Sequence, residues 1–287
     1  MTIAACYVSA EGVVFGADST STMQVMDPGR KEGKEHYFNF GQKVFEIGEK
    51  STLAVTTWGL GSLGSTSYRT LIALLADSLI ASPAKSVEEV AWRWNQLYWD
   101  SYYRFFAGFF ERARFLAGKQ DRTEDEELEL VKLHETWFAG FCLGGYVLPN
   151  RSPEAYQMTF RVTMPLAEPP VRLSMGAAKF WGWSNLIERV LWGVDDNVFS
   201  AVLKTGKWNG TPEELAQALL SQQLGQPIDL PLREAIDWVH ASIYTTIKAM
   251  KFSHWAPYCG GPIEVAVVST DRRFRWVRHK DFSAALC

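Results

Sequence analysis

The chain has 287 residues, a formal net charge of −3 and a hydrophobic content of 47%. This length suits one large domain or two small ones, and the apolar content is ample for a packed core. The low net charge excludes a broad electrostatic attraction to nucleic acid or to an anionic membrane surface. No run approaches the roughly 18 apolar residues of a membrane span, and the start lacks the pattern of a signal peptide. We therefore expect a soluble, cytoplasmic protein.

The four cysteines, at positions 6, 142, 259 and 287, are scattered along the chain without CxxC spacing. Such scattering favours neither a zinc site nor a disulfide framework. A mixed acidic segment at 121–129 is typical of a solvated loop and helix start, and it is a poor basis for a metal site. The sequence therefore indicates a reducing compartment.

The first eighteen residues predict a β-hairpin that ends at a hydroxyl and a carboxylate. Two apolar runs, 3–8 and 13–17, are separated by a short segment that ends in Gly12. This pattern is typical of a hairpin, in which the glycine can supply the positive φ that the turn needs. A turn centred just before Gly12 brings Thr2 nearly opposite Asp18.

Thr2 is the candidate nucleophile. Met1 precedes a small residue, so an aminopeptidase can remove it and leave Thr2 with a free α-amino group. The hydroxyl of an N-terminal Thr can then attack, while its own amine, with a pKa of about 7.7 to 8.0 in peptides, accepts the proton. The alternative is that Thr2 is an ordinary strand residue.

Lys43 is the candidate partner of the Asp18 carboxylate. It begins an alternating segment in which it shares one face with Phe45 and Ile47. A lysine beside two core side chains is costly unless it is paired, and a pair with Asp18 beside Thr2 would keep the Thr2 amine ready to accept a proton. The alternative is that Lys43 starts the strand and reaches solvent.

The turn that contains Gly59 is a candidate source of an oxyanion donor. A predicted strand at 53–57 is followed by the sequence Trp-Gly-Leu-Gly and by a predicted helix at 66–80. A strand-to-helix turn that contains glycine can direct a backbone N–H into a site, where it stabilises a developing oxyanion. The alternative is a tight turn without chemistry.

The rest of the chain predicts a helical middle, then strands, helices and a last hairpin. One long helix is expected over 86–117, begun by a capping box of Ser86 and Glu89, and its many aromatic residues either fill the core or contact another subunit. A strand is expected at 36–40 and a hairpin from 137–146 and 155–162. A short strand at 172–175 precedes helices at 180–191, 211–224 and 232–250, and a closing hairpin pairs 263–269 with 274–277.

The order and spacing of these segments resemble the proteasome β-subunit family, including the bacterial proteasome-like peptidases, within the N-terminal nucleophile (Ntn) hydrolases. Thr2, the strand at 3–8, Gly12 and the triplet Gly16-Ala17-Asp18 match the opening pattern of that family, with its interval between threonine and aspartate kept. KVFEIGEK at 43–50, TTWG at 56–59 and CGGPIEVAVVSTD at 259–271 resemble later elements. The resemblance covers most of the chain and is thin between about 84 and 135.

The resemblance implies an α+β fold, a four-layer αββα sandwich of two antiparallel sheets flanked by helices. It implies a single domain over 1–287 with an enlarged, aromatic-rich helical segment at about 84–135. The implied activity is that of a threonine peptidase: Thr2 attacks a peptide carbonyl, Lys43 and Asp18 assist proton transfer, and the Gly59 N–H stabilises the oxyanion. This chemistry needs no cofactor and no metal.

The resemblance also implies a ring-forming homo-oligomer that encloses its sites and accepts peptides or unfolded polypeptide. No nucleic-acid or membrane partner is expected, and the sequence does not identify an ATPase that would deliver substrate. Two alternatives stay open. One is an Ntn amidase of small-molecule amides, and the other is a catalytically silent assembly or interaction protein with the same fold.

The silent alternative rests on departures from the family pattern. Ala256 stands where the family has a supporting aspartate, and the nearby His254 is the candidate replacement. Cys259 stands where the family has a serine. Where active members of the family carry a supporting serine close to the nucleophile, this chain offers Ser174, Met175 or Ala177, depending on the register.

Overall fold

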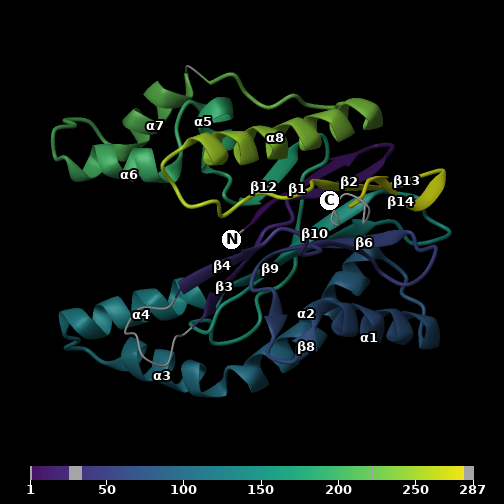
Figure 1. The fold of residues 1–287 in the computed structure, drawn as a ribbon, viewed down its shortest axis with the longest axis horizontal. Coiled ribbons are helices and arrows are strands. Elements are labelled where there is room, and N and C mark those ends of the chain that lie inside the picture. The colour runs from purple at the N-terminus through teal and green to yellow at the C-terminus, as the bar shows by residue number, and fades with distance from the viewer. Residues whose placement is uncertain (1, 26–33, 222, 281–287) are drawn as a thin grey trace.

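The computed structural model describes residues 2–25, 34–221 and 223–280, which form two five-stranded antiparallel sheets packed face to face (Figure 1). The first sheet has the strand order β12 (Ala178–Gly182), β1 (Ile3–Ser9), β2 (Gly12–Ala17), β13 (Glu264–Ser269) and β14 (Arg272–Arg278). The second sheet has the order β11 (Val171–Arg172), β10 (Glu154–Phe160), β9 (Ala139–Gly145), β6 (Leu53–Gly59) and β5 (Val44–Glu46). Two short ribbons accompany them, β3 (Ser21–Val25) with β4 (Lys34–Phe38) and β7 (Ser62–Leu63) with β8 (Thr66–Ser67).

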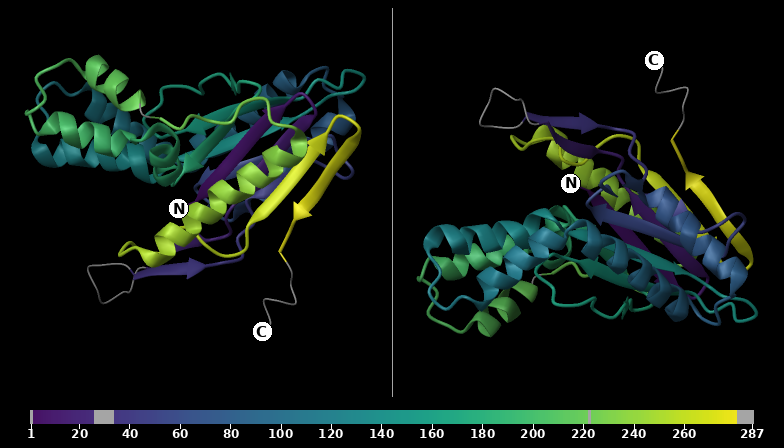
Figure 2. Two further views of the ribbon diagram at one scale, coloured as in Figure 1. Left: turned by 90° about the horizontal axis from the view of Figure 1, so that it is seen from above. Right: turned by 90° about the horizontal axis from the view of Figure 1, so that it is seen from below.

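Helices cover both outer faces of the sheet pair (Figures 1 and 2). On the side of the second sheet lie α1 (Tyr68–Ala81), α2 (Val87–Phe105), α3 (Ala107–Gly118) and α4 (Glu124–Thr136). On the side of the first sheet lie α5 (Asn185–Trp192), α6 (Asp196–Lys204), α7 (Pro212–Leu220) and α8 (Leu232–Phe252). The predicted four-layer αββα sandwich is therefore confirmed. None of the helices in the described residues combines the length and the apolar character that a membrane span needs.

Strand alternation divides the apolar residues among three layers. Because successive side chains of a strand point to opposite faces, Ala4 and Cys6 of β1 pack between the sheets, whereas Ala5 and Tyr7 pack under α8. The aromatic residues of α2 fill the third layer, where the Trp94 ring lies 5.0 Å from that of Phe141 in β9. Sheet-on-sheet packing with helical covers lets both faces of each sheet be buried.

The predicted long helix at 86–117 is two helices. The chain breaks at Phe106, whose φ of −102° and ψ of 20° are not helical, and α3 begins at the next residue. Phe106 is buried against Trp137, with ring centroids 5.1 Å apart, so tertiary packing sets this break. The Ser86 side chain accepts the Glu89 N–H as expected, but the Glu89 carboxylate accepts from the N–H of Lys85 instead of completing the capping box.

The predicted helix at 180–191 begins as a strand. β12 pairs antiparallel with β1, and α5 starts only at Asn185. Phe180 packs in the layer under α8 and Trp181 between the sheets, a two-sided burial that favours aromatic residues in a strand. Helix α6 was not expected as a separate element. The predicted strand at 36–40 lies partly in β4, and Pro28 and Gly29 of the preceding loop fall outside the described residues.

Gly12 is needed for close packing and not for a positive φ. Gly12 is the first residue of β2, and its φ is not positive. The expectation that Gly12 supplies a positive φ to the turn was therefore wrong. A Cβ at this position would lie 2.4 Å from the carbonyl oxygen of Val268 in β13. The hairpin turn consists of Ala10 and Glu11, and β2 sits centrally in its sheet.

Replacing Gly12 should therefore destabilise the sandwich. Gly12→Ala places a methyl group against the backbone of β13, which cannot retreat without loss of strand pairing, and we expect a loss of about 1–3 kcal/mol in the free energy of unfolding. Gly108→Ala is the matched control, because a Cβ there meets nothing within 4 Å in α3. It should stabilise the protein by about 0.5–1 kcal/mol. Urea denaturation measures both, and equal effects would contradict the described packing of β2 on β13.

Candidate active site

The β1–β2 hairpin brings the chain start next to a buried carboxylate. Ala4 pairs with Ala17, and beyond this pair the Ile3 carbonyl accepts the Asp18 N–H at 3.1 Å. The Ile3 N–H in turn donates to Asp18 Oδ1 at 3.1 Å. Ile3, and not Thr2, is therefore opposite Asp18, which is one residue from the expected register. Thr2 is held at the open end of the hairpin beside this carboxylate.

Asp18 is completely buried and its carboxylate receives donors from four segments. Besides the Ile3 N–H, it accepts backbone N–H groups from Thr20 at 3.1 Å and from Gly260 at 3.0 Å. Lys43 Nζ lies 2.6 Å from Oδ1. Charge-assisted bonds of this kind are short and strong. They fix the orientation of the carboxylate and tie the hairpin to the segment before β13.

Lys43 is buried and joins the two sheets at this end of the sandwich. Its carbonyl accepts the Thr57 N–H at 2.9 Å, which fixes it beside β6, while its ammonium contacts Asp18 beside the first sheet. Phe45 and Ile47 instead pack toward the helices. The expectation that Lys43 shares their surroundings was wrong, because Lys43 precedes β5 and its side chain crosses to the other sheet.

Thr2 is 4% exposed, and its backbone is held by the segment between β12 and α5. The Thr2 carbonyl accepts the Trp183 N–H at 2.8 Å. Gly182 precedes it with a φ of 79°, and a Cβ there would lie 1.8 Å from the Thr2 carbonyl oxygen. Gly182 and Trp183 thus position Thr2, and our sequence reasoning missed both because it placed a helix over them.

The segment with Ser174, Met175 and Ala177 lies at the wrong end of β1 to support Thr2. Gly176 donates its N–H to the Val8 carbonyl at 2.7 Å, at the turn end of the hairpin. This corrects the expectation of a supporting serine at 174–177. A serine does stand close to Thr2 along the neighbouring segment. Ser184 directly follows Trp183, whose N–H binds the Thr2 carbonyl.

Gly59 ends β6 at the same end of the sandwich as Lys43. It follows Thr57, the partner of Lys43, by two residues, and it is exposed with a φ of 84°. A Cβ would lie 2.3 Å from the carbonyl oxygen of Phe138, so this backbone shape depends on glycine. Its neighbour Trp58 stacks on Trp181, with ring centroids 4.4 Å apart, and this stack joins the sheets beside the site.

Cys259 adjoins the same carboxylate but is poorly suited to be a nucleophile. Its side chain is buried, and burial, followed by the negative charge of Asp18, raises the pKa of the thiol well above its usual range, with Lys43 partly opposing this effect. A thiol that stays protonated is a weak nucleophile. The exposed His254 lies against Trp255, and Ala256 carries no functional group, so neither replaces a buried aspartate.

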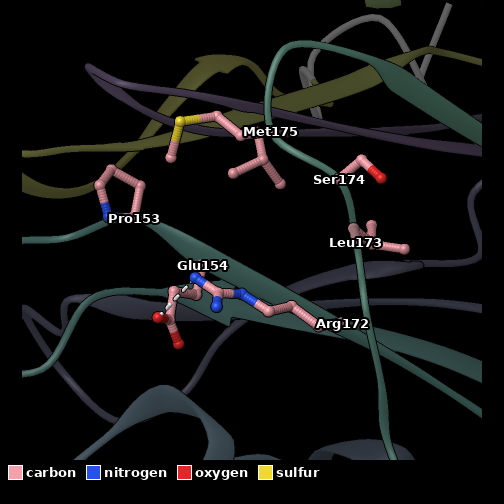
Figure 3. Close-up of a pocket in the computed structure, with 7 residues that line it drawn as sticks. Pro153, Glu154, Arg172, Leu173, Ser174 and Met175 are labelled. Atoms are coloured by element: carbon pink, nitrogen blue, oxygen red, sulfur yellow. Dashed lines mark hydrogen bonds and ion pairs between the residues drawn. The ribbon is translucent and has the colours of Figure 1, made fainter.

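A cavity of about 350 Å³ lies at the opposite end of β1 and is a poor candidate for the site (Figure 3). Val8, Glu154, Arg172 and Met175 are among its lining residues. Its charged groups are already matched, because Arg172 Nη2 lies 2.8 Å from Glu154 Oε1. The candidate nucleophile, carboxylate and lysine all lie at the other end of the hairpin.

Comparison with known proteins gives a likeness in structure only. No protein-family model and no curated protein matches the sequence. Among solved structures, the chain is similar to a Gly-1 mutant of Anbu from Hyphomicrobium sp. strain MC1, at 12% identity and a TM-score of 0.46, over 100% of this chain and 95% of that chain. The roles of individual residues therefore rest on the geometry described above.

Loss of the Asp18 charge should destabilise the protein strongly. Asp18→Asn leaves the Lys43 ammonium buried without its carboxylate, and we expect a loss of about 3–5 kcal/mol in the free energy of unfolding. Combining it with Lys43→Met should regain part of that loss, because no unpaired charge is then buried. The control is Glu129→Gln, which breaks the exposed pair with Arg112 and should have little effect. Urea denaturation measures the free energy of unfolding of each variant. Similar losses for Asp18→Asn and Glu129→Gln would contradict the description of Asp18 and Lys43 as a buried ion pair.

The Cys259 thiol should resist alkylation in the folded protein. Because its pKa is raised, less of it is thiolate at pH 8 than for an ordinary cysteine, and burial blocks the reagent as well. Iodoacetamide labelling followed by peptide mass spectrometry should leave Cys259 unmodified in the folded chain and modified in urea. Rapid labelling of folded protein would instead indicate an accessible, reactive thiol.

Proposed function

We propose that this protein is a proteasome-like N-terminal threonine peptidase that hydrolyses peptide bonds. The observation that carries the proposal is the buried Lys43–Asp18 pair beside the open end of the hairpin that holds Thr2. A buried ion pair is weak evidence for stability, because desolvation offsets much of its attraction. Buried charges beside a hydroxyl near the chain start are more typical of a functional site.

The mechanism starts from a chain whose first residue is Thr2. Its hydroxyl oxygen bonds to the peptide carbonyl carbon while the hydroxyl proton passes to the Thr2 α-amine. The Lys43 ammonium, oriented by Asp18, stabilises the negative charge that develops nearby. The protonated amine then gives its proton to the departing amine of the substrate, and water hydrolyses the resulting ester and regenerates Thr2.

Gly59 is the proposed donor to the oxyanion of the tetrahedral intermediate. Gly59 is exposed at the end of β6, where a substrate can reach its backbone. Its φ is positive, a conformation that other residues adopt only with strain. The proposed chemistry uses only groups of this chain and water. Because the mechanism uses the α-amine of Thr2 as the proton acceptor, the proposal requires removal of Met1.

A silent protein with the same fold is the second candidate, and one specific observation favours it. The described chain offers no carboxylate at the position of Ala256, and His254 points to the surface region around Trp255 instead. An Ntn amidase of small-molecule amides would keep the role of Thr2 and would differ in its substrate. Activity on peptides, compared with activity on small amides, separates the amidase from the peptidase.

We further propose that copies of the chain assemble through the aromatic segment of α2 and α3. Several large side chains there are exposed in the single chain, including Trp92, Phe105, Phe109 and Phe115. Exposed aromatic groups are enriched at subunit interfaces. A ring with its sites inside, located in the cytoplasm, would protect other proteins from an accessible peptidase.

The state of the chain start tests the peptidase directly. Intact-mass measurement of the purified protein should show the loss of Met1, and Thr2→Ala should abolish cleavage of fluorogenic peptides, because the variant lacks the hydroxyl nucleophile. Thr2→Ser retains a hydroxyl and should keep partial activity. Cys259→Ala should remain active, which separates a Thr nucleophile from a thiol.

Two results would contradict the proposal. A retained Met1 leaves Thr2 without a free amine and would favour the silent protein. Equal peptide cleavage by the original chain and by Thr2→Ala would exclude Thr2 as the nucleophile, whatever the state of Met1.

A further inference from the structure

A cavity of about 370 Å³ lies beside the candidate site, between the start of α1 and the segment that follows β14. Its lining includes Gln42, the residue before Lys43, and Gly61, two residues beyond Gly59. Its wall therefore contains close chain neighbours of the proposed lysine and of the proposed oxyanion donor. A side chain of a peptide bound at Thr2 is the natural occupant of such a neighbouring cavity.

Lys280 forms part of the cavity wall and is balanced by a buried carboxylate. Its Nζ lies 3.2 Å from Glu264 Oε1, and Oε2 of Glu264 accepts the Lys43 N–H at 3.2 Å. Burial lowers the pKa of Lys280, Glu264 opposes this, and the positive charges of Lys43 and Arg69 lower it further. Lys280, Lys43 and Arg69 are thus close enough to repel one another. Binding of an anion in the cavity would reduce this repulsion and is therefore favoured.

Arg69 supplies positive charge that the described residues do not match. Arg69 lines the cavity, and its guanidinium donates to the neutral side-chain carbonyl of Gln42 and lies 5.7 Å from the centroid of the Phe45 ring. Lys43 and Lys280 each face a carboxylate, whereas no ion pair of Arg69 occurs among the described residues. A planar guanidinium can bind a carboxylate through two parallel hydrogen bonds.

The first turn of α1 adds to the attraction for an anion. Ser67 caps the helix, and Ser67, Tyr68 and Arg69 all line the cavity. The first turn of α1 contains no acidic residue, so the partial positive charge of the helix N-terminus is not offset locally. None of the residues that line the cavity is acidic.

We propose that this cavity binds a carboxylate, namely the acidic side chain of a peptide substrate next to the bond that Thr2 cleaves. This inference rests on the proposed peptidase function and gives it a substrate class. Arg69 holds the carboxylate, and the apolar ring of Phe45 packs against the methylene groups that carry it. A glutamine side chain has nearly the same shape but lacks the charge.

Cleavage of two acetylated fluorogenic tripeptides that differ only in Glu or Gln at the cleaved residue measures the selectivity. We expect kcat/KM to be about tenfold higher for the Glu peptide, the scale of one charge-assisted hydrogen bond. Arg69→Gln should bring this ratio close to one, and Arg69→Lys should restore part of it. Arg233→Gln, at an exposed position of α8, is the matched control and should keep the original ratio.

Binding to the Thr2→Ala variant tests the cavity without any cleavage. Calorimetry with acetylated peptide amides that end in Glu or Gln should show tighter binding of the Glu peptide, and Arg69→Gln should remove the difference. Equal affinities would overturn the carboxylate site even if the protein cleaves peptides. Preference for Glu in binding, without cleavage by the original chain, would overturn the peptidase and keep the site.

Discussion

The contact between the Lys43 ammonium and the Asp18 carboxylate, 2.6 Å long and buried, is the constraint on which this end of the sandwich depends. It links the strand ends of two different sheets, and each partner is also fixed through its backbone. Neither charge can turn to solvent without unpairing the other, so the two sheets must keep one relative position here. Thr2 is placed by that same arrangement, because the Ile3 N–H binds the Asp18 carboxylate.

Glu264 extends this network of charges toward the neighbouring cavity. It is fully buried in β13, takes the backbone N–H of Lys43 and approaches both His279 and Lys280 at 3.2 Å. Each carboxylate therefore pairs with different side chains. Asp18 pairs with Lys43, the proposed catalytic lysine, and Glu264 contacts His279 and Lys280 in the cavity wall. In this arrangement, the proposed lysine and the wall of the neighbouring cavity belong to one network of charges.

The sequence predicts the layers of the fold better than it predicts the site. The two apolar runs of the first hairpin and the apolar run before Ser269 are local signals, and they identified β1, β2 and β13. The break at Phe106 depends on packing against Trp137, a contact that no local pattern contains. Asp18 was found from its place near Thr2 at the open end of the hairpin, and Lys43 from the apolar residues that share its face. Glu264 opens the apolar run VAVVS, and a carboxylate at that position is a signal that could have identified it.

The missed residues around Thr2 have a different physical origin. Gly182 and Trp183 act through backbone atoms, and a backbone N–H is present in nearly every residue, so composition does not mark it. The mistaken helix at 180–191 also hid them, because it left no strand end or turn at Gly182 and Trp183. Only the pairing of β12 with β1, a contact between distant parts of the chain, shows which residues meet Thr2.

Strand β2 pairs with β13, and the Lys43 N–H donates to Glu264. These contacts between distant parts of the chain have a consequence for synthesis on the ribosome. The β1–β2 hairpin is translated well before β13 and Lys280, which complete its strand pairing and its charge network. A nascent chain therefore carries an unpaired edge on β2 and an incomplete charge network until β13 and the segment after β14 have been made. Co-translational folding would therefore leave the region around Asp18 and Lys43 incomplete while the polypeptide is still being made.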